Sequence, residues 1–202
     1  MEVALESCPC PLDCSSGDAY QLRSRDRVNG LPGEFQIVKC RGCGLLRTNP
    51  RPTPETIGYY YPESYAPYHL RKLHSWTRPG GWLAISVPNL TSLGFRAFKE
   101  SWLHLHLPNH LFHYTPETVL RTLQTSGWQV QRLVYQRDIS DLIGSLGNMM
   151  KDQQRFLTLA EKLATFPSWQ GKLYLPLFPI SWLLAAFGQT WAMTIWAKRN
   201  DD

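Results

Sequence analysis

The stretch "RPGGWLAISVPN", residues 78–89, decides the fold that the sequence predicts. Gly80 and Gly81 supply a turn, the residues from Trp82 to Val87 are almost wholly apolar, and Pro88 ends the run. Short apolar runs between turn residues are typical of strands in parallel sheets that are covered on both faces. The stretch therefore predicts a buried strand of an α/β domain, and such a strand needs neighbouring strands elsewhere in the chain.

The sequence that follows this strand alternates between helical and strand patterns. In "TPETVLRTLQTSG", Thr115 is the expected N-cap, Pro116 occupies the first helical position and Gly127 ends the helix. A strand is expected next, because "WQVQRLVYQR" alternates between apolar and polar residues. The further elements expected are a short helix over 92–102, one helix or a broken pair over 140–165 with Gly144 and Gly147 as weak points, an apolar segment over 173–187, and a last strand from Thr190.

The five cysteines form two groups near the start of the chain, "CPCPLDC" and "CRGCGLL". Cys40 and Cys43, followed by Gly44, match a zinc knuckle, and Cys10 and Cys14 have a spacing that suits a second pair of ligands. Cys8 lies too close to Cys10 to be the obvious choice. The spacing predicts one structural zinc ion bound by Cys10, Cys14, Cys40 and Cys43, with free thiols in a small core as the alternative. Four protein ligands leave no open position for chemistry, so the ion would stabilise the fold.

Residues 49–78 are rich in proline and tyrosine and are expected to form a connector. A short helix is predicted from Pro54 to Tyr61. The tyrosines favour docking of this segment onto a neighbouring domain, because tyrosine can bury its ring while its hydroxyl stays wet. The alternative is that they stack on the bases of a single nucleic-acid strand together with Arg47 and Arg51.

Charge and hydropathy restrict the partners and the location. The net charge is +5, but the basic residues are scattered, so a nucleic-acid partner is not expected. The first 20 residues lack the basic start and apolar run of a secretory signal, which places the chain in the cytoplasm. Residues 173–197 carry no charge and are long enough to cross a bilayer. Pro176, Pro179 and Gly188 interrupt this segment and favour packing within the protein, with membrane association as the alternative.

Several segments, in order along the chain, resemble one family, the class I S-adenosylmethionine-dependent methyltransferases that carry an N-terminal zinc-binding module. "CRGCGLLRTNPRPTPETIGYYYPESYAPY" looks like the zinc module and connector of these enzymes. "RPGGWLAISVPN", "WLHLHLPNHLFHYTPETVLRTLQTSGW" and "DLIGSLGN" are similar to the second half of their catalytic domain. The resemblance implies a small zinc-ribbon-like module over 1–48, the connector over 49–78, and an incomplete Rossmann-like α/β methyltransferase domain over 79–202.

The first half of the family's catalytic domain has no counterpart in this sequence. In the family, a strand runs into a glycine-rich D-x-G-x-G turn that cradles the cofactor, and a second strand ends in an acid that holds the ribose. No such turn lies between Tyr68 and Arg78. The resemblance therefore implies a truncated methyltransferase-like protein, inactive as this chain alone, for which S-adenosylmethionine is the family's cofactor without a site here. The alternative is a non-enzymatic zinc-binding interaction module.

Four of the six histidines follow the apolar strand, namely His104, His106, His110 and His113. Ligands of open α/β sheets bind beyond the carboxyl ends of the strands. The resemblance places "PNHLFHYT" on the substrate side, which makes His110 and His113 candidates for positioning or proton transfer. A polar loop without catalytic function is the alternative. A histidine metal site is not favoured, because no carboxylate lies nearby in the sequence.

The missing half also has a consequence for the apolar strand. In the family this strand lies between the fourth strand and the last one, so loss of the first four strands leaves one edge of residues 82–87 unpaired. An apolar edge without an interrupting Lys or Pro is prone to pair with another chain. We therefore expect self-association or a partner protein at this edge, with adsorption to a membrane surface as a further outlet.

Overall fold

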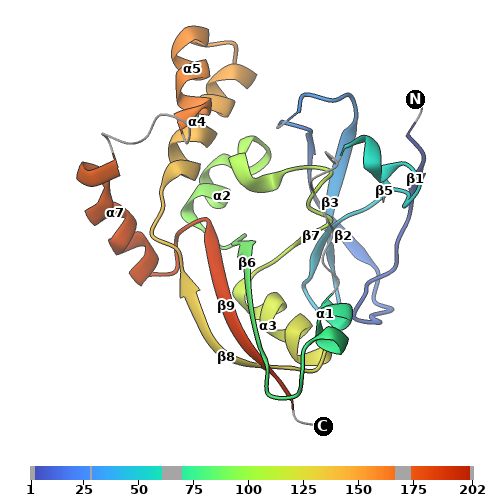
Figure 1. Ribbon diagram of the computed structural model, residues 1–202. Coiled ribbons are helices and arrows are strands. Elements are labelled where there is room, and N and C mark those ends of the chain that lie inside the picture. The colour runs from blue at the N-terminus through green and yellow to red at the C-terminus, as the bar shows by residue number, and fades with distance from the viewer. Residues whose placement is uncertain (1–2, 28, 61–69, 167–173, 201–202) are drawn as a thin grey trace. The chain divides into compact units, whose positions relative to one another are not determined.

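The computed structural model describes residues 3–27, 29–60, 70–166 and 174–200 (Figure 1). It contains helices and antiparallel sheets. Two compact units are present: the first comprises Met1–Ile85, His106–Arg132 and Ile195–Asp202, and the second comprises Ser86–Leu105 and Leu133–Thr194. Each unit is assembled from separate stretches of chain, whereas the segments expected from the sequence are contiguous. The expected boundaries at residues 48 and 78 stay a prediction.

The first unit contains a four-stranded antiparallel sheet in the order β2-β3-β4-β7. Its strands are β2 (Asp18–Arg25), β3 (Glu34–Cys40), β4 (Leu46–Thr48) and β7 (Phe112–His113). Inward-facing residues alternate along β3, where Phe35 and Ile37 are buried. Two further short strands, β1 (Leu5–Glu6) and β5 (Arg51–Pro52), pair with each other in antiparallel orientation; β1 precedes β2 in sequence and β5 follows β4.

The fourth strand of this sheet comes from a distant part of the sequence. Leu46 is paired with His113, and Arg47 with Phe112. The sequence predicts no strand at Phe112 and His113, which lie in the loop expected after the apolar strand. The histidine-containing segment is therefore part of the sheet that carries the second cysteine pair.

The connector has less helix than expected near its start, but it has an unexpected helix near its end, over Leu70–Trp76. In the described part of the predicted helix over 54–61, which ends at Tyr60, the structure has a 3-10 turn, η1 (Ile57–Tyr59). Tyr60 is buried, its hydroxyl donates a hydrogen bond to the Pro32 carbonyl at 2.7 Å, and its ring meets Phe35 edge-on. These contacts agree with docking of the connector onto the neighbouring part of the protein, since Pro32 and Phe35 contact the Tyr60 side chain. Tyr61, Tyr65 and Tyr68 lie outside the described residues.

The described part of the first unit also contains the helices α1 (Leu70–Trp76) and α3 (Pro116–Thr125). The start of α3 is as predicted, because the Thr115 hydroxyl accepts a hydrogen bond from the Thr118 N–H at 3.2 Å and the Thr118 hydroxyl accepts one from the Thr115 N–H at 2.9 Å. Gly127, with φ of 84°, follows the end of the helix.

The apolar strand predicted from residues 82–87 is β6 (Trp82–Pro88), in a sheet of order β6-β9-β8 with β9 (Ala192–Arg199) and β8 (Trp128–Tyr135). The Arg199 N–H donates to the Gly81 carbonyl at 2.8 Å, and the Asn89 N–H donates to the Trp191 carbonyl at 2.6 Å. The start of β6 thus meets the end of β9, so these strands are antiparallel. Hydrogen bonds at the two ends of β8 show the same relation to β9 (Figure 1). The expectation of a parallel sheet is wrong, because β9 lies between β6 and β8 and runs antiparallel to both.

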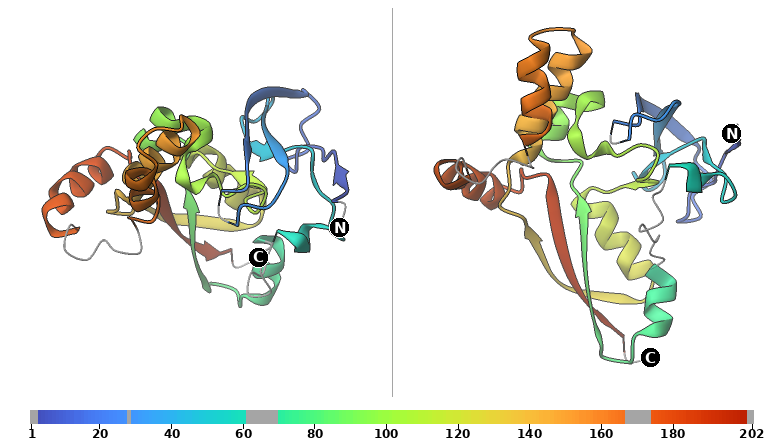
Figure 2. Two further views of the ribbon diagram at one scale, coloured as in Figure 1. Left: turned by 90° about the horizontal axis from the view of Figure 1, so that it is seen from above. Right: turned by 45° about the horizontal axis from the view of Figure 1, so that its top comes forward.

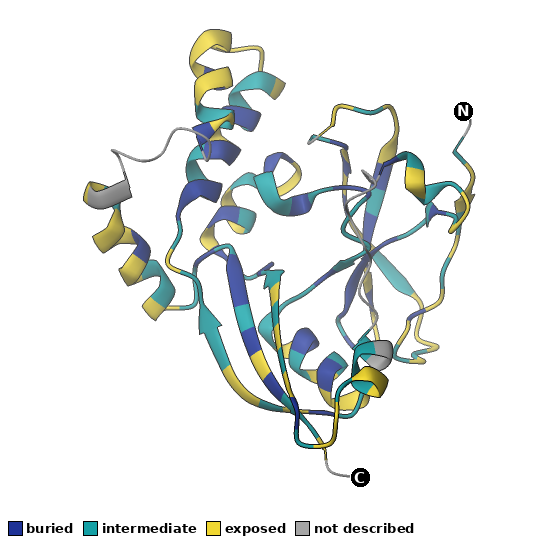
Figure 3. Cartoon of the chain, in the orientation of Figure 1, coloured by how far each residue is buried: buried dark blue, intermediate teal, exposed yellow. Residues whose placement is uncertain are grey.

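The expectation that β6 is buried on both faces is also wrong. Its residues alternate between exposed and half-buried, and the exposed set includes Trp82, whose exposed fraction is 59%, Ala84 and Ser86 (Figure 3). The central strand β9 is the buried one, with Ala192, Met193, Ile195 and Ala197 inaccessible to solvent. An apolar run is compatible with either environment, and only the neighbouring elements decide between them.

The second unit is mainly helical. Its helices within the described residues are α2 (Leu93–Phe98), η2 (Lys99–Ser101), η3 (Leu103–Leu105), α4 (Ser140–Asp152), α5 (Leu157–Ala164) and α7 (Tyr174–Ala186). The predicted region 140–165 is a broken pair, and α4 and α5 lie side by side (Figure 2). The break falls at residues 153–156. Gly144 and Gly147 lie inside α4, where the Leu103 side chain and the α5 backbone, respectively, approach them closely.

The apolar C-terminal segment divides into a helix and a strand, as expected from its interruptions. Pro179 lies within α7, and Gly188, with φ of 67°, lies between α7 and β9. Within the described ranges, no helix has both the length and the apolar character needed to cross a membrane.

Candidate metal centre

The turn between β3 and β4 holds two of the five cysteines. Cys40 is the last residue of β3, and its N–H donates to the Leu45 carbonyl at 2.9 Å. The Gly44 N–H donates to the Cys40 carbonyl at 2.9 Å, and Gly44 has φ of 76°, a conformation that glycine adopts without strain. This tight turn brings Cys40 and Cys43 together, as the C-x-x-C-G pattern predicts.

Cys10 and Cys14 lie on the loop that leads into β2. The Asp13 N–H donates to the Cys10 carbonyl at 3.1 Å, which closes a turn between these two cysteines. The two cysteine loops approach closely at Gly42, where a Cβ would lie 3.0 Å from both the Cys14 Cβ and the Ser16 Oγ. A glycine at position 42 thus allows the four sulfur atoms to converge.

The Sγ atoms of Cys10, Cys14, Cys40 and Cys43 all lie within 4.8 Å of one another. The Cys10 and Cys43 sulfurs are 3.5 Å apart, too far for a disulfide, and all five cysteines are free. A tetrahedron of sulfurs around an ion at about 2.3 Å has edges of roughly 3.8 Å. The four cysteines are therefore positioned to bind a metal ion. Cys8 is outside this group and its thiol donates to the Glu6 carboxylate, with 3.6 Å between the atoms.

The thiols differ in their acidity. Burial raises the pKa of Cys10, Cys14 and Cys43. Burial also acts on Cys40, but the backbone N–H groups of Cys43 and Gly42 and the neighbouring thiols outweigh it and lower its pKa to about 7. One sulfur is thus prepared to be a thiolate, while ionisation of all four needs a cation among them.

Apolar side chains enclose the cysteines. Leu45 is fully buried with Cys10, Cys40 and Cys43, and Leu12, Phe112 and Tyr114 pack against this cluster. Burial raises the pKa of Tyr114 to about 12. Phe112 and Tyr114 were not identified as part of the site by sequence reasoning. The alternation of aromatic residues around His113 is the one signal that could have indicated a strand there.

Arg47 of β4 is buried and joins this strand to half-buried Asp18 of β2 and to the N-terminal loop at Cys8. The Arg47 guanidinium donates to both carboxylate oxygens of Asp18, at 2.9 and 2.8 Å, and to the Cys8 carbonyl at 3.1 Å. A planar guanidinium fits this contact with two carboxylate oxygens. Because the Arg47 guanidinium is already paired with Asp18, the structure does not favour the alternative in which Arg47 stacks on nucleic-acid bases.

The two candidate histidines lie together, because the rings of His110 and His113 meet edge-on with centroids 6.5 Å apart. His104 stacks on Trp191 in the second unit, with ring centroids 3.7 Å apart. His106, His110 and His113 belong to the first unit, where the rings of His106 and His110 stack at 4.9 Å. Apart from the four cysteines, no group of three or more metal-binding side chains converges in the part of the chain that the structure describes.

His113 lies in the interior, with an exposed fraction of 1%. Its Nε2 is 3.3 Å from the Thr48 hydroxyl, and its Nδ1 has no hydrogen-bond partner. Burial, and secondarily the charge of His110, lowers its pKa to about 3, so the ring is neutral at physiological pH. In this conformation His113 does not reach solvent, which argues against proton transfer to a substrate. The role predicted for His110 stays a prediction.

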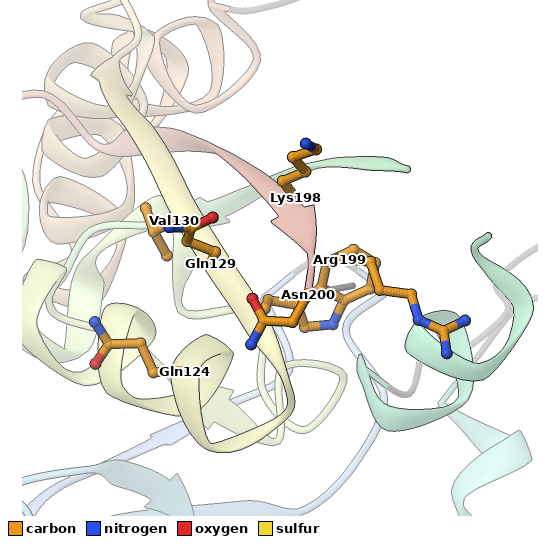
Figure 4. Close-up of a pocket in the computed structure, with 7 residues that line it drawn as sticks. Gln124, Gln129, Val130, Lys198, Arg199 and Asn200 are labelled. Atoms are coloured by element: carbon orange, nitrogen blue, oxygen red, sulfur yellow. The ribbon is translucent and has the colours of Figure 1, made fainter. Parts of the chain in front are cut away.

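The first unit also has a groove of about 490 Å³ (Figure 4). Its lining consists of Gln124, Trp128, Gln129, Val130, Lys198, Arg199 and Asn200. The Arg199 side chain extends toward α1, where its guanidinium donates to the Thr77 carbonyl. The described lining has no carboxylate, thiol or imidazole, and Lys198 supplies its one amine, a group that can act as a nucleophile or a general base.

Comparisons of the chain with known protein families, with curated proteins and with solved structures find no match.

Proposed function

We propose that this chain is a zinc-binding protein of methyltransferase ancestry, in which zinc stabilises the fold and methyl transfer does not occur. The observation that carries the proposal is the convergence of four cysteine sulfurs within 4.8 Å. Zinc is the metal that most often occupies closed four-thiolate sites with a knuckle turn. Because every coordination position is taken by protein, the ion supplies folding free energy and no Lewis-acid chemistry.

The ancestry rests on the sequence resemblance and gains support from the strand order. The resemblance implies that residues 82–87 pair with the last strand of the sheet, and β6 pairs with β9. It also implies that no strand lies on the other side, and β6 is the edge of its sheet among the described strands. A Rossmann-like arrangement with its first half deleted accounts for both features.

The absence of the D-x-G-x-G turn from the sequence opposes S-adenosylmethionine binding. Such a turn supplies the backbone N–H groups and the small residues against which the cofactor packs. The proposed location is the cytoplasm, where a reducing environment keeps five cysteines as thiols.

Metal analysis of the purified chain tests this proposal. We expect one zinc per chain by inductively coupled plasma mass spectrometry, loss of zinc in Cys40→Ser, and retention of zinc in Cys8→Ser as the matched control. Isothermal titration with S-adenosylmethionine is expected to show no binding. Purification without chelator that yields a metal-free folded chain would contradict the zinc site, and micromolar cofactor binding would contradict the loss of the enzyme activity.

A second candidate function is that of an interaction module, favoured by the β6 edge. β6 carries no charged residue, and Trp82 is largely exposed. Unpaired backbone groups along such an edge favour addition of a strand from a second copy or from a partner protein. Ile85→Lys is expected to reduce association in sedimentation velocity, whereas Gln131→Lys on the exposed side of β8 is not. A strictly monomeric parent chain at high concentration would exclude self-association.

A further inference from the structure

The histidine segment, residues 106–114, is attached to the metal module through its backbone. The Thr48 N–H donates to the Leu111 carbonyl at 2.9 Å, and β7 pairs with β4 through Leu46–His113 and Arg47–Phe112. A strand of two residues is too short to be stable without the sheet that it joins. The ordering of this segment therefore depends on the adjacent β4.

Side chains reinforce the attachment on both faces of β7. Successive residues of a strand point to opposite faces, so Phe112 and Tyr114 share one face and His113 points to the other. Phe112 and Tyr114 pack against the cluster of Cys10, Cys40, Cys43 and Leu45. The face of the histidine segment that carries the two aromatic rings thus covers the metal centre.

The Thr48 hydroxyl contacts the segment on the opposite face. Thr48 Oγ1 donates to the His110 carbonyl at 3.0 Å and lies 3.3 Å from His113 Nε2. A hydroxyl has a single proton, so while it donates to His110 it accepts from Nε2–H, which fixes one neutral tautomer of His113. Thr48 is buried and is the last residue of β4, the strand that follows the Cys40–Cys43 turn.

We infer that metal binding at the four cysteines and docking of the histidine segment are coupled, so that metal loss releases residues 106–114 from the sheet. The inference rests on the proposed zinc site. Without the ion, the four thiols no longer hold the Cys10–Cys14 loop against the Cys40–Cys43 turn, and the surface on which Phe112 and Tyr114 pack is lost. Coupling of this kind is reciprocal, so docking of the segment must strengthen zinc binding by the same factor.

Hydrogen exchange on the full chain tests the first direction. As zinc is withdrawn with a chelator, amide protection in residues 106–114 is expected to fall at least about tenfold, in step with residues 34–48. Residues 140–164, which form α4 and α5 in the second unit, are the internal control and keep their protection. Protection that persists in 106–114 while it is lost in 34–48 would overturn the inference.

Zinc affinity of variants tests the second direction. Phe112→Ala is expected to weaken zinc binding by about tenfold, equivalent to about 1.4 kcal/mol, as measured by competition with a chromophoric chelator. The matched control is Phe156→Ala, which removes a ring that is 76% exposed in the second unit. If the segment is docked with and without metal, the substitution weakens both states equally and the affinity does not change.

Thr48→Val provides a second variant if Phe112→Ala does not fold. It keeps the shape of the side chain and removes the hydroxyl, so zinc binding is expected to weaken about fivefold. The ¹⁵N chemical shifts of His113 should lose the signature of a single tautomer. If both variants bind zinc as tightly as the parent chain, the coupling is overturned. The proposed function still stands in that case, provided that the parent chain binds one zinc. A parent chain without zinc would overturn both.

Discussion

The Asp141 carboxylate accepts a hydrogen bond from the Trp102 indole N–H at 3.3 Å, and both side chains are buried in the second unit. Asp141 lies in the first turn of α4, and Trp102 follows the 3-10 turn after α2. Nearby, the Ser145 hydroxyl accepts from the Leu103 N–H at 2.9 Å. These buried hydrogen bonds hold the segment 99–105 against α4.

This carboxyl group predicts a pH dependence of stability. Burial raises the pKa of Asp141 to about 7, well above the value of about 3.9 for an unfolded chain. The folded state therefore retains a proton that the unfolded state loses, and stability falls as the pH rises from about 4 to about 7. Above that range both states are ionised and the loss levels off. The steepest slope from this one group is about 1.4 kcal/mol per pH unit.

Asp141→Asn isolates this effect from the titration of the cysteines. The amide keeps an acceptor for Trp102 and does not ionise, so the variant should gain stability relative to the parent between pH 4.5 and 7.5. Urea unfolding of both proteins at several pH values provides the measurement. A constant difference between the two proteins across this range would show that folding does not raise the pKa of Asp141.

Gly94→Ala is expected to destabilise the second unit by more than about 2 kcal/mol. A Cβ at this position would overlap the Asp141 carboxylate and would lie 2.9 Å from the Trp102 Nε1. Gly58→Ala is the control, because nothing lies within 4 Å of its Cβ position. Denaturant unfolding should separate the two variants clearly, and equal midpoints would refute the close approach at Gly94.

The two glycines of α4 are expected to differ in their response to substitution. At Gly147 an added Cβ would overlap the Ala164 backbone of α5, which cannot move aside, whereas at Gly144 it would meet the end of the Leu103 side chain. Gly147→Ala should therefore separate α4 from α5 and lower the thermal midpoint by several degrees more than Gly144→Ala. Circular dichroism melts check this order, and the reverse order would contradict the packing.

Arg47→Ala is expected to cost about 2–4 kcal/mol, because it leaves Asp18 and the Cys8 carbonyl without their charged donor. Arg23→Ala is a matched control from the same sheet. The Arg23–Glu34 pair is exposed on both sides, so its loss should cost at most about 0.5 kcal/mol. Chemical unfolding of the zinc-loaded proteins gives both values, and similar costs would mean that the Arg47–Asp18 pair contributes no more than a surface pair.

Local signals account for what the sequence predicted correctly. Four residues from Cys40 to Cys43 specify the knuckle together with Gly44, and the capping residues Thr115 and Pro116 specify the start of α3. Both are decided by chemistry within a few positions of the chain. The metal centre could be predicted for the same reason, since each half of it is a short-range pattern.

Long-range pairing explains what the sequence did not predict. Nothing in the two residues of β7 indicates that they pair with β4, because a short strand has no pattern of its own beyond two alternating side chains. Likewise, the composition of β6 does not show that its neighbour is antiparallel or that Trp82 is exposed. The contact of Asp141 with Trp102 depends on the packing of α4, which no local pattern fixes.

The position of β9 in its sheet has a consequence for the order of folding. Synthesis proceeds from the N-terminus, so β6 and β8 leave the ribosome before the strand that lies between them. Neither can form its ladder with a neighbour until β9 emerges. This sheet must therefore assemble after translation of β9, while the β2–β3–β4 meander can form as soon as its own residues are made.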